Sequence, residues 1–297
     1  MSKTDNIVLI AGATGQQGGA AAAQLLADGW RVRALTRHPS SAAAAALRRA
    51  GAEIVDGDMD DRASLDAALR GVYGVFSVQP AGFGGDFTPN DEIRLGKNLA
   101  DAARAADVRH FVYTSVGGAD RESGVPHFQS KWLIEEHIRA VGLPATLLRP
   151  VSFMEILLSP YVRLQKGTLS FIVSPNTPVQ HIAVPDIGVF VAQAFNSFPA
   201  FVGQALEIAG DSFTMMEAAA AITAVTRRSI RYVQYPPELI SENPVFAAIL
   251  RFCETKGFAA DIPKLRKLHP RLLTFEGWLA KTGKALFEAR LAREANL

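Results

Sequence analysis

His127 and Lys131 lie four residues apart in the stretch HFQSKWLIEEH, which spans residues 127–137. On a helix this spacing places both side chains on one face. The pair could form an acid–base site, a clamp for a bound ligand, or part of a solvated helix face. A histidine titrates near neutrality, so His127 could act as a general acid. For Lys131 the alternative to ligand binding is an ion pair with Glu135, four residues further along.

A glycine loop near the amino end supplies a candidate ligand for this pair. Residues 12–19 read GATGQQGG, with glycines in a GxxGxxG spacing. The loop follows the apolar run IVLIA and precedes an alanine-rich helical stretch, which is the context of a dinucleotide phosphate site. A plain glycine turn is the alternative. The residues expected to contact the pyrophosphate are Gly12, Thr14, Gly15, Gln16, Gln17 and Gly18.

The second predicted strand, WRVRALTR over residues 30–37, indicates which nucleotide the loop holds. NAD sites commonly place Asp or Glu at the end of this strand, where the carboxylate bonds the ribose 2′-hydroxyl. Here the strand ends at Arg37, whose planar guanidinium suits a 2′-phosphate. We therefore expect NADP(H) rather than NAD(H) as the cofactor. A solvated arginine after a strand is the alternative.

Further contacts are expected at the carboxyl ends of later strands, because ligands bind there in parallel α/β sheets. Asp58 ends the third strand and can bond the adenine amino group, with Met59 against the ring. The other strand-end candidates are Val78, Gln79 and Pro80 after the fourth strand and Thr114 and Ser115 after the fifth.

Strands and helices alternate as far as Pro150. Such alternation predicts crossover helices, so we expect an α/β chain with a Rossmann-type doubly wound parallel sheet. After Pro150 the alternation stops. Residues 151–167 are expected to contain a short helix, and the remainder is expected to form a smaller, mostly helical α/β lobe. The expected domains are a dinucleotide-binding domain over 1–152 and a substrate or partner lobe over 153–297, with segments returning to the first domain.

Composition argues against several classes of protein. Hydrophobic residues make up 48% of the 297, which argues against disorder, and a formal charge of +2 argues against direct nucleic-acid binding. No apolar stretch reaches the roughly 20 residues of a membrane helix, and no HxxxH or Cys/His cluster indicates a metal site. A single cysteine, Cys253, fits a cytoplasmic protein. The excess of Lys and Arg from residue 249 onward indicates a solvated helical surface or, alternatively, a face for an acidic protein partner.

Taken together, these segments resemble the NmrA-like family of atypical short-chain dehydrogenases, and most closely its NADPH redox-sensor proteins. The resemblance covers nearly the whole chain and includes GATGQQGG, VRALTRHP, GAEIVDGDMDD, EIRLGKNLADAAR, PHFQSKWLIEEHIRAVGLPATLLRP, FMEILLSP and LTFEGWL. It implies that the glycine loop takes the pyrophosphate and Arg37 the 2′-phosphate. The other contacts that it implies are adenine contacts by Asp58 and Met59, cofactor contacts by Val78 to Pro80, a basic contact by Arg94, a bond from Lys131 to the nicotinamide ribose, and Phe153, Met154 and Glu155 beside the nicotinamide.

The chain departs from this family pattern at three positions. The second base for the 2′-phosphate is replaced by Ser41, which weakens the preference for NADP. A polar asparagine near the nicotinamide is replaced by Ile156. Catalytic short-chain dehydrogenases carry a YxxxK motif, in which tyrosine exchanges the proton, and here the tyrosine position is His127 while Lys131 is kept. Ser115 falls near the usual catalytic serine, although such a residue more often only caps a strand end.

Two functions are therefore expected. The first is a sensor or regulator of the NADPH/NADP balance with little turnover, which would act through a regulatory protein partner. The second is an NADPH-dependent reductase of a quinone, an azo compound or another small conjugated substrate, because such acceptors take hydride with less help from a protein acid. Apolar residues that would suit a flat substrate, or a core, are Phe83, Phe128, Phe153 and Met154. Oligomerisation stays open.

Overall fold

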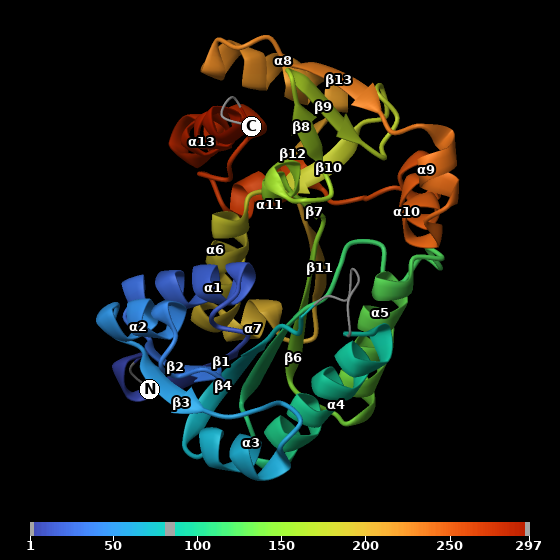
Figure 1. Cartoon of the computed structure of the whole chain (residues 1–297). Helices are drawn as coiled ribbons and strands as arrows, with labels where there is room; N and C mark the ends of the chain where they lie inside the picture. Colours follow the sequence, from blue (N-terminus) through green and yellow to red (C-terminus); the bar gives the residue numbers. More distant parts are fainter. Residues whose placement is uncertain (1–2, 81–86, 295–297) are drawn as a thin grey trace. The chain divides into compact units, whose positions relative to one another are not determined.

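The computed structural model describes residues 3–80 and 87–294, so Phe83 lies outside the described residues (Figure 1). The chain divides into two compact units. Unit 1 comprises Met1–Asp120, Pro126–Arg149 and Val184–Leu206, and unit 2 comprises Arg121–Val125, Pro150–Ala183 and Glu207–Leu297.

A seven-stranded sheet organises unit 1, in the order β11-β6-β5-β4-β1-β2-β3. The strands are β1 Ile7–Ala11, β2 Arg31–Thr36, β3 Glu53–Asp56, β4 Val72–Ser77, β5 His110–Thr114, β6 Ala145–Pro150 and β11 Ala205–Ile208. The pairs from β3 to β6 are all parallel. From β1 the order runs to β2 on one side and to β4 on the other. This order and the parallel pairing confirm the predicted α/β fold. In doubly wound sheets, ligands bind at the point where the strand order reverses.

Helices cover both faces of this sheet (Figure 1). They are α1 Gln16–Ala27, α2 Ala42–Arg49, α3 Arg62–Ala68, α4 Pro89–Ala105, α5 Pro126–Ala140, α6 Val184–Asn196 and α7 Phe198–Phe201, after the short 3-10 turn η1 Lys3–Asp5. On one face α6 crosses α1 closely, because a Cβ on Gly188 would lie 2.4 Å from the Ala20 carbonyl oxygen. On the other face α4 packs beside α5. β1 is buried along its whole length, as expected for a strand covered on both faces.

Unit 2 holds two small sheets, of order β12-β10-β7 and β13-β9-β8. Its strands are β7 Ser152–Phe153, β8 Arg163–Gln165, β9 Thr168–Phe171, β10 Val179–Ile182, β12 Asp211–Phe213 and β13 Arg231–Gln234. Its helices are η2 Met154–Leu158, α8 Met215–Thr226, α9 Pro237–Ser241, α10 Pro244–Thr255, α11 Ile262–Leu268, α12 Phe275–Trp278, the π-helical turn η3 Leu279–Gly283 and α13 Lys284–Glu294. Contacts among aromatic rings run through its core from Phe213 through Phe275 and Trp278 to Phe287.

The segment 151–167 differs from the expectation of a helix with a turn. Only Met154–Leu158 is helical, as a 3-10 turn, and Arg163–Gln165 forms β8. β8 and β9 make a hairpin through Lys166 and Gly167, which both have positive φ. Two left-handed residues are what a tight two-residue hairpin turn requires.

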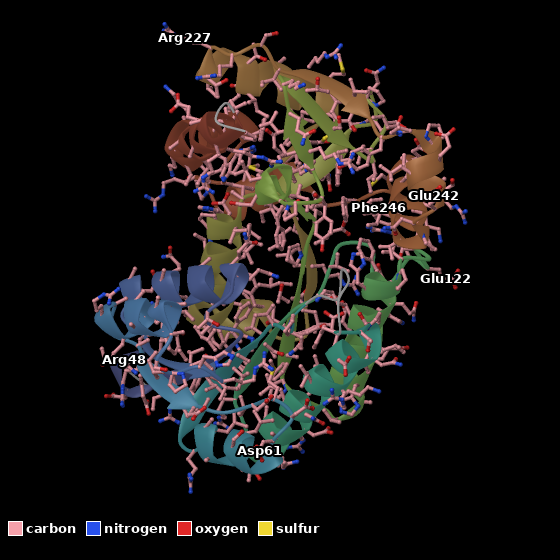
Figure 2. All side chains as sticks on the ribbon, viewed as in Figure 1. Arg48, Asp61, Glu122, Arg227, Glu242 and Phe246 are labelled. Carbon is pink, nitrogen blue, oxygen red and sulfur yellow. The ribbon has the colours of Figure 1, made fainter. Side chains whose placement is uncertain are left out.

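Several helices in this chain begin at a side-chain cap. Asp61, labelled in Figure 2, accepts from the Ala63 N–H at 2.9 Å at the start of α3. Thr88 and Asp91 form a reciprocal capping box at the start of α4, and α8 begins with the same device. Caps of this kind each stabilise a helix by about 1 kcal/mol.

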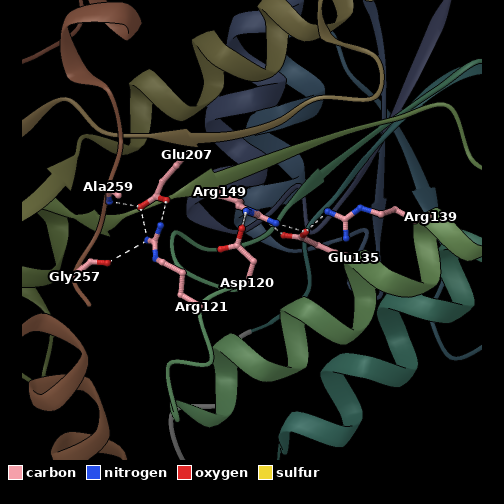
Figure 3. A network of polar contacts seen from close by, with 8 residues as sticks. All are labelled: Asp120, Arg121, Glu135, Arg139, Arg149, Glu207, Gly257 and Ala259. Carbon is pink, nitrogen blue, oxygen red and sulfur yellow. Dashed lines mark hydrogen bonds and ion pairs between the residues drawn. The ribbon is translucent and has the colours of Figure 1, made fainter. Parts of the chain in front are cut away.

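Ion pairs within each unit stand where the chain passes from one unit to the other (Figure 3). In unit 1, Arg149 is 7% exposed and donates to both oxygens of the fully buried Glu135, at 2.9 and 2.8 Å, and also to Asp120. In unit 2, Arg121 makes a two-pronged contact with Glu207, at 3.0 Å for both bonds. Arg–carboxylate pairs of this geometry are the directional and strong kind.

Candidate dinucleotide site

Close contacts in the glycine loop leave no room for a side chain at Gly12 or Gly18. The Gly15 N–H donates to the Gly12 carbonyl at 3.0 Å, and Gly12 has φ of 73°. A Cβ on Gly12 would lie 2.7 Å from a methyl of Val78. A Cβ on Gly18 would lie 2.1 Å from the Gly12 oxygen. The loop therefore exposes bare backbone beside the end of β4, as a pyrophosphate cradle requires.

The first turn of α1 carries no side-chain cap. Its N-cap is Gly15, and Thr14, Gly15 and Gln16 are exposed. The N–H groups of an uncapped helix start favour an anion. Gln17 is held differently, since its Oε1 accepts from the buried Thr114 hydroxyl at 2.7 Å. That bond ties the glycine loop to the end of β5.

At the end of β2, Arg37 is exposed and has no hydrogen-bond or ion-pair partner among the described residues. Its guanidinium is thus available to a phosphate. Ser41 does not compete for this role, because its Oγ accepts from the Ala44 N–H at 3.2 Å as the N-cap of α2. The residue that replaces the second base is a structural cap.

The loop after β3 brings Asp58 and Met59 toward the same edge. The Asp58 carboxylate accepts from the Asp60 N–H at 3.0 Å. The Met59 carbonyl accepts from the Asn98 amide at 3.1 Å, and its sulfur lies 3.8 Å from the Gln79 amide nitrogen. Arg94 is exposed and pairs with Asp60 and Asp91, so in this structure its charge is already balanced.

Two buried polar atoms at the ends of β4 and β5 lack partners among the described residues. They are Oε1 of Gln79 and Oγ of Ser115, in side chains that are each 4% exposed. The Gln79 amide nitrogen is used, since it donates to Ser77 Oγ at 2.9 Å. Buried polar groups normally have partners, and those without one commonly await a ligand or water. Val78 is buried beside Gln79, whereas Pro80 is exposed.

Helix α5 buries both His127 and Lys131, each 7% exposed. Lys131 Nζ donates to Glu92 Oε1 at 2.7 Å, and Glu92 is fully buried in α4. The alternative pair with Glu135 is wrong, because Glu135 faces Arg149 and Arg139. Glu92 was not among the expected site residues. The signal that could have found it is a lone carboxylate on the apolar stripe of a helix, in line with Leu95, Gly96 and Leu99.

Burial changes the chemistry of His127. Loss of solvent, with a smaller effect from the charge of Lys131, lowers the pKa of His127 to about 3. The imidazole is therefore neutral at pH 7 and packs edge-on against Phe128. A neutral imidazole is a far weaker acid than imidazolium, so burial disfavours proton donation by an imidazolium at His127 near neutrality.

The remaining expected residues lie in unit 2. Phe153 ends β7, and Met154 and Glu155 begin η2, followed by Ile156. Met154 is fully buried in the core of that unit, so it serves packing. Glu155 accepts from the indole N–H of the buried Trp278 at 3.0 Å. The described residues contain neither a group of metal-binding side chains nor a helix that is long and apolar enough to cross a membrane.

The model of the NmrA-like family matches residues 4–279. The chain belongs to the NmrA-like family. Among relatives of this NmrA-like protein, a reductase of (4-alkanoyl-5-oxo-2,5-dihydrofuran-3-yl)methyl phosphate from Streptomyces griseus is 31% identical, over 94% of this chain and 99% of its own. An NAD(P)H azoreductase from Xenophilus azovorans is 30% identical over 76% of both chains. The crystal structure of the negative transcriptional regulator NmrA with NADP matches the fold, with a TM-score of 0.80, 20% identity and coverage of 97% and 98%.

Proposed function

We propose that unit 1 binds NADP(H) and that the protein is a reductase of a small conjugated acceptor. The observation that carries this is a glycine loop of bare backbone at the end of β4, where the buried Oε1 of Gln79 has no partner among the described residues. The pyrophosphate would lie on residues 12–18, the 2′-phosphate on Arg37, and the nicotinamide ribose on Lys131.

A neutral His127 fits such acceptors. A bound NADPH supplies a hydride, and a conjugated acceptor completes its reduction by taking a proton from water, so no protein acid is needed. The Streptomyces griseus relative is named for a substrate of this electronic type, a ring with carbonyl groups beside a double bond. This likeness favours the reductase over the sensor.

A sensor of the NADPH/NADP balance is the second candidate. It is favoured by the same neutral His127, because a dinucleotide site without an acid can bind the cofactor and transfer little hydride. The sensor would need a partner protein, and the basic carboxyl-terminal region is the candidate face for an acidic one.

One experiment separates the two functions. Purified protein is mixed with NADPH and a panel of butenolides, enones, quinones and azo dyes, and absorbance of the reduced nicotinamide is followed. We expect turnover that is lost in Lys131→Ala. No turnover with any acceptor, together with tight NADPH binding, would favour the sensor. In a binding arm, Arg37→Gln should lower the preference for NADP over NAD by about tenfold, and equal binding of the two by the wild type would refute the role of Arg37.

A further inference from the structure

A fully buried carboxylate holds Lys131 in place. Glu92 Oε1 accepts from Lys131 Nζ at 2.7 Å, and Oε2 accepts from the hydroxyl of Ser130, the residue before Lys131. Both oxygens of Glu92 are thus occupied by neighbours on one turn of α5. Its exposed fraction is zero, so water does not share these bonds.

The packing of α4 on α5 creates this contact. Gly96 lies one turn after Glu92, and a Cβ on Gly96 would lie 2.6 Å from the side chain of Ile134. Only glycine lets the two helices approach so closely there. Ile134 lies one turn after Ser130 and Lys131, so the same approach brings Glu92 against both of them. The close packing of α4 on α5 therefore fixes the position of Glu92 relative to Ser130 and Lys131.

The pair has no net charge, which bears on the cofactor. Removing either partner from a buried ion pair leaves an uncompensated charge in a poorly solvated place. The nicotinamide ring is positive when oxidised and neutral when reduced. A bare ammonium at Lys131 would repel the oxidised ring and leave the reduced ring unaffected, whereas a neutralised Lys131 discriminates little between them.

We propose that Glu92 is a positioning residue that sets the relative affinity of the site for oxidised and reduced NADP. It does so by neutralising Lys131 while holding its ammonium at a fixed point. The inference rests on the proposed function, because it requires Lys131 to lie near the nicotinamide ribose.

The test measures the dissociation constants of NADP⁺ and NADPH for the full chain by calorimetry at fixed salt. In Glu92→Gln, the ratio of the NADP⁺ constant to the NADPH constant should rise about tenfold, mainly through weaker NADP⁺ binding. Ser130→Ala is the matched control, because it removes one hydrogen bond to Glu92 and keeps both charges. Its ratio should stay at the wild-type value. The double variant Glu92→Gln/Lys131→Gln removes both charges and should also restore the ratio.

An equal loss of affinity for both nucleotides in Glu92→Gln would overturn the proposal, because it would mean a structural role only. If that variant does not fold, Lys131→Gln gives the opposite test. An isolated buried carboxylate tends to take up a proton, so the ratio is followed from about pH 7 to about pH 9. Where the carboxylate is charged, NADP⁺ should bind more tightly relative to NADPH than in the wild type, and a ratio unshifted over the whole range would overturn the proposal. A wild-type chain that binds neither nucleotide would instead refute the proposed function.

Discussion

His127 is held neutral by its surroundings. Its side chain is 7% exposed, and burial together with Lys131 lowers its pKa to about 3. The unfolded value lies near 6.5. At pH values between these two, His127 is protonated in the unfolded chain and neutral in the folded chain. The stability of the fold must therefore fall as pH falls through about 6.5 and below.

We expect His127→Gln to reduce this loss. Between about pH 7 and pH 5 the variant should gain roughly 2 kcal/mol of unfolding free energy relative to the wild type, because glutamine takes up no proton. Urea unfolding at stepped pH measures the difference. His110 and His181 also have lowered pKa values, each about 4, but they are present in both proteins and cancel. A difference that stays constant with pH would show that folding does not change the pKa of His127.

The sequence predicts candidate site residues but not their partners. The glycine spacing, Arg37 and the shared face of His127 and Lys131 all follow from local pattern, and the structure shows the expected local geometry. The partner of Lys131 does not follow, because Glu92 lies on another helix. Local spacing favoured Glu135 instead, and only tertiary packing turns Glu135 toward Arg149.

At the scale of elements, helix α1 contains two adjacent glycines with opposite roles. A Cβ on Gly18 would lie 2.1 Å from the Gly12 oxygen, whereas a Cβ on Gly19 meets nothing closer than 3.6 Å. Gly18→Ala should push α1 away from the loop, lower the stability by about 2 kcal/mol or more and abolish dinucleotide binding. Gly19→Ala should leave binding intact and raise the stability by up to about 1 kcal/mol, since alanine favours helix. Melting temperature and NADPH titration check both, and equal behaviour of the two variants would contradict the packing argument.

Alternation predicted the elements of unit 1 as far as Pro150, because each strand and helix there repeats one packing scheme. It failed over 151–167, where no element is long enough to show a period. The Lys166–Gly167 turn that makes the β8–β9 hairpin depends on two positive φ values, and lysine gives no sign of this.

At the scale of the molecule, the two arginines that contact Glu135 differ in how much they contribute to stability. Arg149 is buried with Glu135, and Arg139 contacts the same carboxylate from a side chain that is 44% exposed (Figure 3). Arg149→Met should cost about 3–5 kcal/mol of stability, because Glu135 loses its main partner in a buried place. Arg139→Met should cost less than about 1 kcal/mol. Thermal unfolding of the two variants measures this, and similar losses would show that burial does not decide the strength of the pair.

The path of the chain between units could not be derived from periodicity. The alternation ends at Pro150, yet Val184–Leu206 returns to unit 1. It returns because Gly188 lets α6 meet α1 at Ala20 and because residues before β11 pair with β6. The local sequence pattern predicts neither contact.

That returning segment has a consequence for how the protein is made. The edge of β6 is closed by bonds from the Gly203 N–H to the Ala145 carbonyl and from the Leu147 N–H to the Gln204 carbonyl. During synthesis on the ribosome, β6 emerges about fifty residues before the segment that closes it. Until then the unpaired backbone N–H and C=O groups of β6 can pair with a strand of another nascent chain, and such pairing leads to edge-to-edge aggregation. A chaperone that shields this edge would improve the yield of folded protein more than one that acts after release.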